Sequence, residues 1–185
     1  MIRIIAVVAA LMCTAPALAQ NLPARVDPQN AILLDTRHGR IVIKLRPDIA
    51  PKHAERIKML SREGFYNNAP FHRVIGGFMA QTGDGARGDG TGKSKYPDLP
   101  AEFSSAPFVR GVVGMARSSN PNSANAQFFI MFAPASHLNG QYTVVGEVVS
   151  GMGAVDNIKK GPPEQNGAVS NPDRIVKMQV AAGAK

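Results

Sequence analysis

The chain has no tryptophan, one cysteine among 185 residues, and aromatic side chains at 6% of its positions. A single cysteine, Cys13, cannot form a disulfide within one molecule and provides no cysteine-based metal site. The four histidines do not follow a His-Glu-x-x-His or similar metal-binding spacing, and no Gly-x-Ser-x-Gly segment occurs. These absences argue against a hydrolase and against metal catalysis.

Positive charge is in excess but is not clustered. The 21 Lys and Arg against 13 Asp and Glu give a formal net charge of +8, and the longest basic run is Lys159-Lys160. A nucleic-acid-binding protein needs a clustered basic stripe or an aromatic stacking platform. We therefore expect no nucleic-acid partner, and we interpret the charge as an aid to solubility.

The first nineteen residues form a segment of their own. Arg3 precedes a short apolar run over 4–12, and Ala17-Leu18-Ala19 is typical of an export cleavage site. We predict that residues 1–19 are a secretory signal peptide and that the protein is exported to the periplasm, with full secretion as the alternative. The apolar run is too short to span a bilayer, so we expect no stable membrane anchor. Lipidation of Cys13 is a less favoured alternative, because a bulky residue precedes it.

The remaining chain is patterned as one mainly-β domain. Residues 20–29, with two prolines, are predicted to be a flexible lead. Pro51 in a first turn, a following apolar stripe and Gly64 predict a helix over 50–63, and a short helix is expected near 151–159. Short alternating or apolar runs predict strands at 32–35, 41–45, 71–75, 78–82, 112–116, 127–132, 143–148 and 174–180. Many short strands with two helices are typical of an all-β or α+β fold.

One cation lies within an otherwise apolar strand pattern. Arg73 lies in a segment over 71–81 that reads as two strands with a glycine pair, Gly76-Gly77, at the bend between them. Arginine stays charged and is almost never buried without a partner. Arg73 is therefore either paired with an acid of its own chain or available to a ligand.

Five sequence blocks carry a resemblance to a known family. They read FHRVIGGFMAQ (71–81), GDGARGDGTG (83–92), GMAR (114–117), SANAQFFI (123–130) and LNGQYTVVGEV (138–148). In this order and spacing the chain resembles the cyclophilins, a family of peptidyl-prolyl cis-trans isomerases. The resemblance implies an isomerase domain over 30–181, formed by a closed eight-stranded antiparallel barrel with a helix capping each end, and no cofactor or metal.

The resemblance also implies the site residues. Arg73 and Gln81 are the candidate catalytic residues. The apolar socket for proline would be formed by Phe78, Met79, Phe129 and Leu138, and the other candidate substrate-binding residues are His72, Ala116, Arg117, Gln127, His137 and Tyr142. His137 occupies a position at which many eukaryotic members have a tryptophan that contacts cyclosporin, so we expect weak cyclosporin binding.

The chemistry of the reaction explains why an arginine suits this role. Rotation about an X-Pro bond crosses a barrier of about 18–20 kcal/mol because the twisted amide loses its resonance. A catalyst must bind the twisted amide better than either planar form. A guanidinium can donate to the imide nitrogen, whose lone pair localises during the twist, but one such bond is worth only about 1.5–3 kcal/mol. The rest must come from the socket and from polar groups that hold the peptide on each side of the proline.

Two functions remain open from the sequence. The first is an isomerase that acts on proline-containing peptides and on folding proteins. The alternative is a chaperone or scaffold on the same fold that binds proline-containing peptides without catalysis. In either case the short loops favour a monomer.

Overall fold

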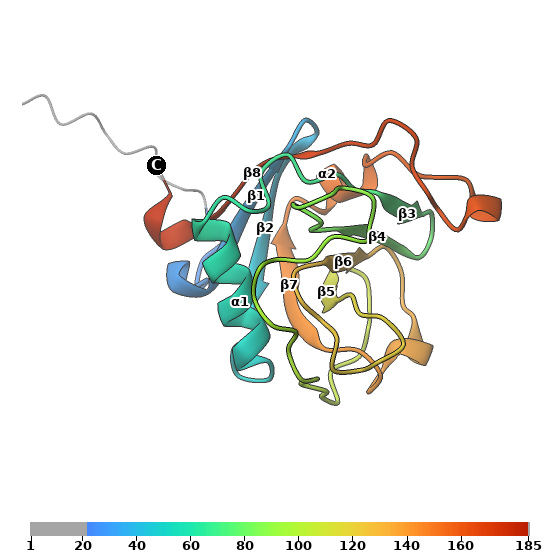
Figure 1. Cartoon of the computed structure of the whole chain (residues 1–185). Coiled ribbons are helices and arrows are strands. Elements are labelled where there is room, and N and C mark those ends of the chain that lie inside the picture. Colours follow the sequence, from blue (N-terminus) through green and yellow to red (C-terminus); the bar gives the residue numbers. More distant parts are fainter. Residues whose placement is uncertain (1–21, 185) are drawn as a thin grey trace, which may run out of the picture.

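One sheet of eight strands organises the protein (Figure 1). The computed structural model describes residues 22–184, so the predicted signal peptide lies outside the described residues. The strands are β1 (Ala31–Thr36), β2 (Gly39–Leu45), β3 (Arg73–Ile75), β4 (Met79–Thr82), β5 (Val112–Met115), β6 (Phe128–Met131), β7 (Val144–Ser150) and β8 (Ile175–Val180). Their hydrogen-bonded order is β3-β4-β6-β5-β7-β2-β1-β8, and all neighbours are antiparallel.

The predicted closure of the barrel is wrong. The sheet is an open half-barrel, with β3 and β8 as its edge strands. The outer edge of β3 pairs with residues 167–168 instead of β8, through an isolated bridge between Arg73 and Ala168 and a hydrogen bond from Val74 N to Gly167 O (2.8 Å). An isolated bridge between Pro70 and Arg174, and backbone hydrogen bonds such as that from Phe71 N to Asp173 O (2.9 Å), link the segments that precede the two edge strands.

The two predicted helices are present. α1 (Pro51–Arg62) begins at Pro51 and is followed by Gly64 in the left-handed region, at a φ of +71°. α1 packs against β7 and β8, whereas α2 (Met152–Asp156), which is shorter than predicted, packs against β2. Four short 3-10 helices were not predicted: η1 (Pro28–Asn30), η2 (Ser136–Leu138), η3 (Pro163–Gln165) and η4 (Ala181–Gly183).

The apolar side chains form a main core and a smaller second cluster. The main core fills the space between the sheet and the two helices, with side chains such as Ile57 and Leu60 of α1. The second cluster includes Met79, Phe129 and Leu138, three residues of the predicted socket. This second cluster therefore carries the apolar part of the candidate site.

The described part of the lead lies against the sheet. Leu22 and Val26 pack on Ala31, Leu33 and Val42. No helix within residues 22–184 is both long enough and apolar enough to cross a membrane.

Candidate active site

The register of three neighbouring strands builds one wall of the candidate site. Arg73 of β3 lies opposite Gln81 of β4, and Gln81 lies opposite Phe129 of β6. Because directly opposed residues share a face of a sheet, their side chains form one row. The β3–β4 turn contains Gly77 at a φ of +72° and is closed by a hydrogen bond from Phe78 N to Ile75 O (3.0 Å), as the glycine pair predicts.

A cavity of about 330 Å³ opens at this wall. Its apolar floor includes Met79, Phe129 and Leu138, which are 2%, 5% and 7% exposed. Ten of the residues that the sequence predicts for the site line it: Arg73, Phe78, Met79, Gln81, Ala116, Arg117, Phe129, His137, Leu138 and Tyr142. Residues from four separate sequence blocks therefore meet at one concave, half-apolar site.

The guanidinium of Arg73 is held by neutral acceptors. Nε donates to the backbone oxygen of Asn166 (3.1 Å), Nη2 donates to Asn166 Oδ1 (2.9 Å), and Nη1 donates to Gln81 Oε1 (3.3 Å). None of the ion pairs found within residues 22–184 involves Arg73. Burial lowers the pKa of Arg73 from a value far above neutral, so the side chain stays charged. Its charge is positioned but not neutralised.

Asn166 is a site residue that the sequence analysis missed. It follows η3 in the left-handed conformation, at a φ of +53°, and Gly167 after it has a φ of +73°. An Asn-Gly pair is a recognisable turn signal. Nothing in the sequence, however, connects this turn with Arg73, which lies 93 residues earlier in the chain.

Aromatic contacts support the floor and the rim of the cavity. Phe108, which the sequence analysis also missed, stacks on Phe129 with ring centroids 5.7 Å apart, and Tyr142 meets Phe129 edge-on at 5.8 Å. A Cβ on Gly114 would lie 2.4 Å from the Phe129 ring, so only glycine fits beneath it. At the rim, the Arg117 guanidinium lies 4.4 Å from the centroid of the Tyr142 ring.

Two predicted binding residues do not line the cavity. His72 packs against the glycine-rich loop, where a Cβ on Gly90 would come within 2.9 Å of its ring, and burial lowers the pKa of His72. Gln127 lies behind Gln81 and accepts a hydrogen bond from Gln81 Nε2 (3.1 Å). Gln127 instead lines a neighbouring cavity of about 260 Å³, which shares Ala116 and Arg117 with the first. In the part of the chain described, no group of three or more His, Cys, Asp or Glu side chains is placed to hold a metal ion.

Comparison with known proteins shows the family. The model of the cyclophilin type peptidyl-prolyl cis-trans isomerase family matches residues 31–180. A protein of Brucella suis named "Probable peptidyl-prolyl cis-trans isomerase" is 59% identical over 177 residues, which cover 90% of each chain. Peptidyl-prolyl cis-trans isomerase B of Escherichia coli is 42% identical over 136 residues, covering 69% of this chain and 83% of the relative.

Solved structures of the same family resemble this chain. A cyclophilin from Hirschia baltica superposes with a TM-score of 0.78 at 27% identity, covering 86% of this chain and 77% of that one. A cyclophilin-type isomerase of Cryptosporidium parvum, crystallised in the presence of the dipeptide Ala-Pro, gives 0.73 at 26% identity, covering 81% and 98%. The chain belongs to the cyclophilin family of peptidyl-prolyl cis-trans isomerases, and it is an enzyme of that family.

Proposed function

We propose that this cavity binds the prolyl ring of a peptide and that Arg73 stabilises the twisted X-Pro bond, in exported proteins that fold in the periplasm. The observation that carries the proposal is the charged guanidinium of Arg73 beside an apolar floor, held by neutral acceptors. The relative crystallised in the presence of Ala-Pro supports a proline-containing peptide as the ligand.

The hydrogen bonds of Arg73 leave donors for a substrate. An arginine side chain has five N–H donors, and the three hydrogen bonds to Asn166 and Gln81 use three of them. The remaining donors can meet the imide nitrogen when its lone pair localises in the twist, while Met79, Phe129 and Leu138 hold the ring. A charge-assisted bond of about 1.5–3 kcal/mol corresponds to roughly one to two powers of ten in rate.

The test is isomerase activity on a short Ala-Pro peptide, measured by exchange NMR or a protease-coupled assay. We expect Arg73→Ala to lower kcat/KM by about tenfold or more without loss of folding, because one charge-assisted bond to the twisted imide is removed. Arg62→Ala is the matched control, since Arg62 is an arginine on the exposed side of α1. An Arg73→Ala enzyme as fast as the wild type would reject the role, and peptide binding without turnover by the wild type would support a binding-only module.

Cyclosporin provides a further test of the cavity. His137 lies at its edge with its ring centroid 5.8 Å from that of Phe78, where many eukaryotic members of the family present a tryptophan. An imidazole offers less apolar area to the drug than an indole, so we expect inhibition only at concentrations well above nanomolar. A nanomolar inhibition constant would contradict this expectation.

Export to the periplasm is supported by the N-terminal segment. Arg3, the apolar run after it and Ala17-Leu18-Ala19 together have the pattern of a cleaved leader. An isomerase in that compartment would act on X-Pro bonds of proteins that fold after export, because the uncatalysed rotation takes about 10–100 s.

A further inference from the structure

A line of hydrogen bonds leads from Arg73 away from the cavity. Gln81 accepts from Arg73 Nη1 through Oε1 (3.3 Å) and donates through Nε2 to Gln127 Oε1 (3.1 Å). Gln127 Nε2 in turn donates to two backbone oxygens of the glycine-rich loop, those of Gly90 (2.9 Å) and Gly92 (3.0 Å). The line therefore ends on a loop that does not contribute to the cavity around Arg73.

The direction of each link is fixed by its neighbour. Gln127 Nε2 faces two carbonyl oxygens. If the amide were reversed, Oε1 would face these oxygens, and no hydrogen bond could form because neither side carries a proton. Gln127 Oε1 must then face Gln81, which turns Gln81 Nε2 toward Gln127 and Gln81 Oε1 toward Arg73. A guanidinium has donors and no acceptor, so this orientation is the one that Arg73 requires.

The loop is held by a buried carboxylate. Asp84 is 1% exposed, and its Oδ2 accepts from the backbone N–H groups of Gly90 and Gly92, both at 2.9 Å. Its Oδ1 accepts from the backbone N–H groups of Ala86 (3.2 Å) and Arg87 (2.8 Å). Burial raises the pKa of Asp84, but hydrogen bonds from backbone N–H groups, with Arg87 and Gly92 foremost, lower it to about 2. Asp84 is therefore ionised at neutral pH, and the two glycines that donate to it are those that accept from Gln127.

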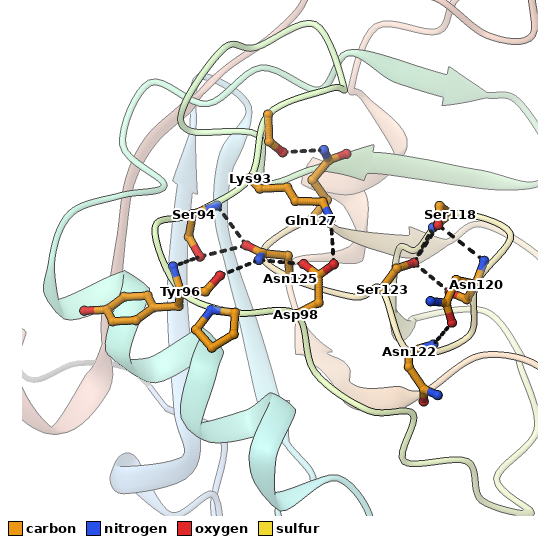
Figure 2. A network of polar contacts seen from close by, with 12 residues as sticks. Lys93, Ser94, Tyr96, Asp98, Ser118, Asn120, Asn122, Ser123, Asn125 and Gln127 are labelled. Carbon is orange, nitrogen blue, oxygen red and sulfur yellow. Dashed lines mark hydrogen bonds and ion pairs between the residues drawn. The ribbon is translucent and has the colours of Figure 1, made fainter.

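The loop is seated too tightly to move independently of Asp84. A Cβ on Gly92 would lie 2.0 Å from Asp84 Oδ1, and one on Gly90 would lie 2.9 Å from the His72 ring. The chain just beyond the loop is also anchored, because Asn125 Oδ1 accepts from the backbone N–H of Ser94 (2.8 Å). Figure 2 shows this anchor beside Gln127.

We propose that Asp84 is a positioning residue for the isomerase reaction: it holds the glycine-rich loop so that Gly90 and Gly92 orient Gln127, and through Gln81 the guanidinium of Arg73. The inference rests on the proposed role of Arg73. Asp84 does not line the cavity, and the apolar floor is not part of this line of hydrogen bonds. Loss of Asp84 should therefore weaken stabilisation of the twisted bond, which lowers kcat. Binding of the planar peptide, which KM reports, should stay unchanged.

Asp84→Asn tests the proposal, because it keeps the size of the side chain but turns an NH₂ group toward backbone donors. On an Ala-Pro peptide we expect kcat to fall about three- to tenfold, the range that one hydrogen bond supports, with KM within about twofold. The NMR resonance of the Arg73 Nε–H group should shift or broaden. Asp173→Asn is the matched control: Asp173 is 7% exposed, accepts from Lys159 N (2.8 Å) and should leave all three readouts unchanged.

A second variant tests whether Asp84 acts through Gln127. Gln127→Asn shortens the amide by one methylene, so it cannot reach Gly90, Gly92 and Gln81 together. We expect a loss of kcat and a shifted Arg73 resonance, and no further loss when Asp84→Asn is added. If Asp84→Asn does not fold, a Gln127→Asn enzyme with unchanged kcat and an unchanged Arg73 resonance would still reject the proposal, because the line from Asp84 to Arg73 passes through Gln127.

The outcomes that would overturn the proposal are distinct from those that would overturn the function. A folded Asp84→Asn enzyme with unchanged kcat and an unchanged Arg73 resonance would reject Asp84 as a positioning residue, and so would losses of kcat that add in the double variant. A rise in KM alone would point instead to direct contact with substrate. An inactive wild type would reject the proposed function, whereas the Arg73 resonance would still report whether Asp84 fixes the guanidinium.

Discussion

At the scale of single residues, the site joins a permanent charge to an apolar floor without acid–base machinery. Arg73 donates to neutral oxygens of Asn166 and Gln81, so these contacts orient the guanidinium without neutralising its charge. Rotation about an amide breaks no bond and moves no proton. The contribution of Arg73 should therefore not depend on the titration of a neighbouring group.

This argument predicts a flat pH profile. Burial lowers the pKa of His72, so its ring stays neutral to a lower pH than an exposed histidine, and Arg73 keeps its charge despite its own lowered pKa. We expect kcat/KM on an Ala-Pro peptide to change less than about twofold between pH 6 and 8. A bell-shaped profile would contradict this, and its disappearance in His72→Asn would assign it to that histidine.

Most of the candidate site could be predicted from the sequence blocks that carry the resemblance to the cyclophilins, and the residues that could not be predicted share one property. Ten predicted residues line one cavity because each block is a strand or turn whose register is set locally. Asn166 and Phe108 were missed because they act through contacts with residues far along the chain. His72 is adjacent to Arg73 in sequence, but strand alternation directs it to the opposite side, against the loop at Gly90.

At the scale of elements, α1 depends on a carboxylate from outside the helix. Ala50 precedes the helix and offers no side-chain cap. Glu102, from the long connection between β4 and β5, accepts instead from the backbone N–H groups of Lys52 and His53, both at 3.1 Å, and contacts His53 Nδ1 at 2.7 Å. Figure 1 shows this connection passing close to α1. Glu102 thereby joins the helix to the connection that also carries the glycine-rich loop.

Removal of this cap should destabilise the protein. We expect Glu102→Gln to lower the free energy of unfolding by about 1–3 kcal/mol, because the helix N-terminus and the buried His53 ring both lose a charged hydrogen-bond acceptor. Urea unfolding at pH 7 measures the change. Glu164→Gln is the control, since Glu164 lies exposed in η3 and its replacement should leave stability unchanged.

The same variant has a defined pH dependence. Burial raises the pKa of Glu102, but hydrogen bonds from the His53 side chain and from the backbone of His53 and Lys52 lower it by more. The pKa of Glu102 therefore lies below its usual value. The unfolded chain therefore takes up this proton at a higher pH than the folded protein, and stability is lost as the pH falls below about 4.3. Between about pH 5 and 3, wild-type stability should fall more steeply than that of Glu102→Gln. Equal slopes would show that the carboxylate is not held in this way.

The sequence predicts the elements better than it predicts how they join. All eight strands and both helices were predicted with ends within three residues of those observed, because alternation, Pro51 and Gly64 are local signals. The prediction of a closed barrel was wrong because closure depends on whether β3 and β8 meet. They do not meet because the outer edge of β3 is hydrogen-bonded to the chain after η3, with Val74 N donating to Gly167 O (2.8 Å) and Val169 N donating to His72 O (3.0 Å).

At the scale of the whole molecule, charge and exposed surface argue for a single copy in solution. Among residues 22–184, the large apolar side chains that are exposed are Phe103, Val109 and Val176. A specific interface buries about 800 Å² on each partner, usually around an apolar centre. Cleavage after Ala19 would remove Arg3 and leave 20 basic and 13 acidic side chains, a net charge of +7, which would add repulsion between copies.

We therefore expect a processed, thiol-free monomer. Cleavage after Ala19 would also remove Cys13, so thermal unfolding of the mature protein should be the same with and without a reductant.

Expression of the full chain in a Gram-negative host, followed by mass spectrometry of the periplasmic fraction, should find a protein that begins at Gln20. Light scattering should give the mass of one chain. Replacing Ala17 and Ala19 by bulky residues should retain the leader, because the cleavage site requires small side chains. Full-length protein in the cytoplasm, a lipid on Cys13 or a stable dimer would each contradict the corresponding part of this expectation.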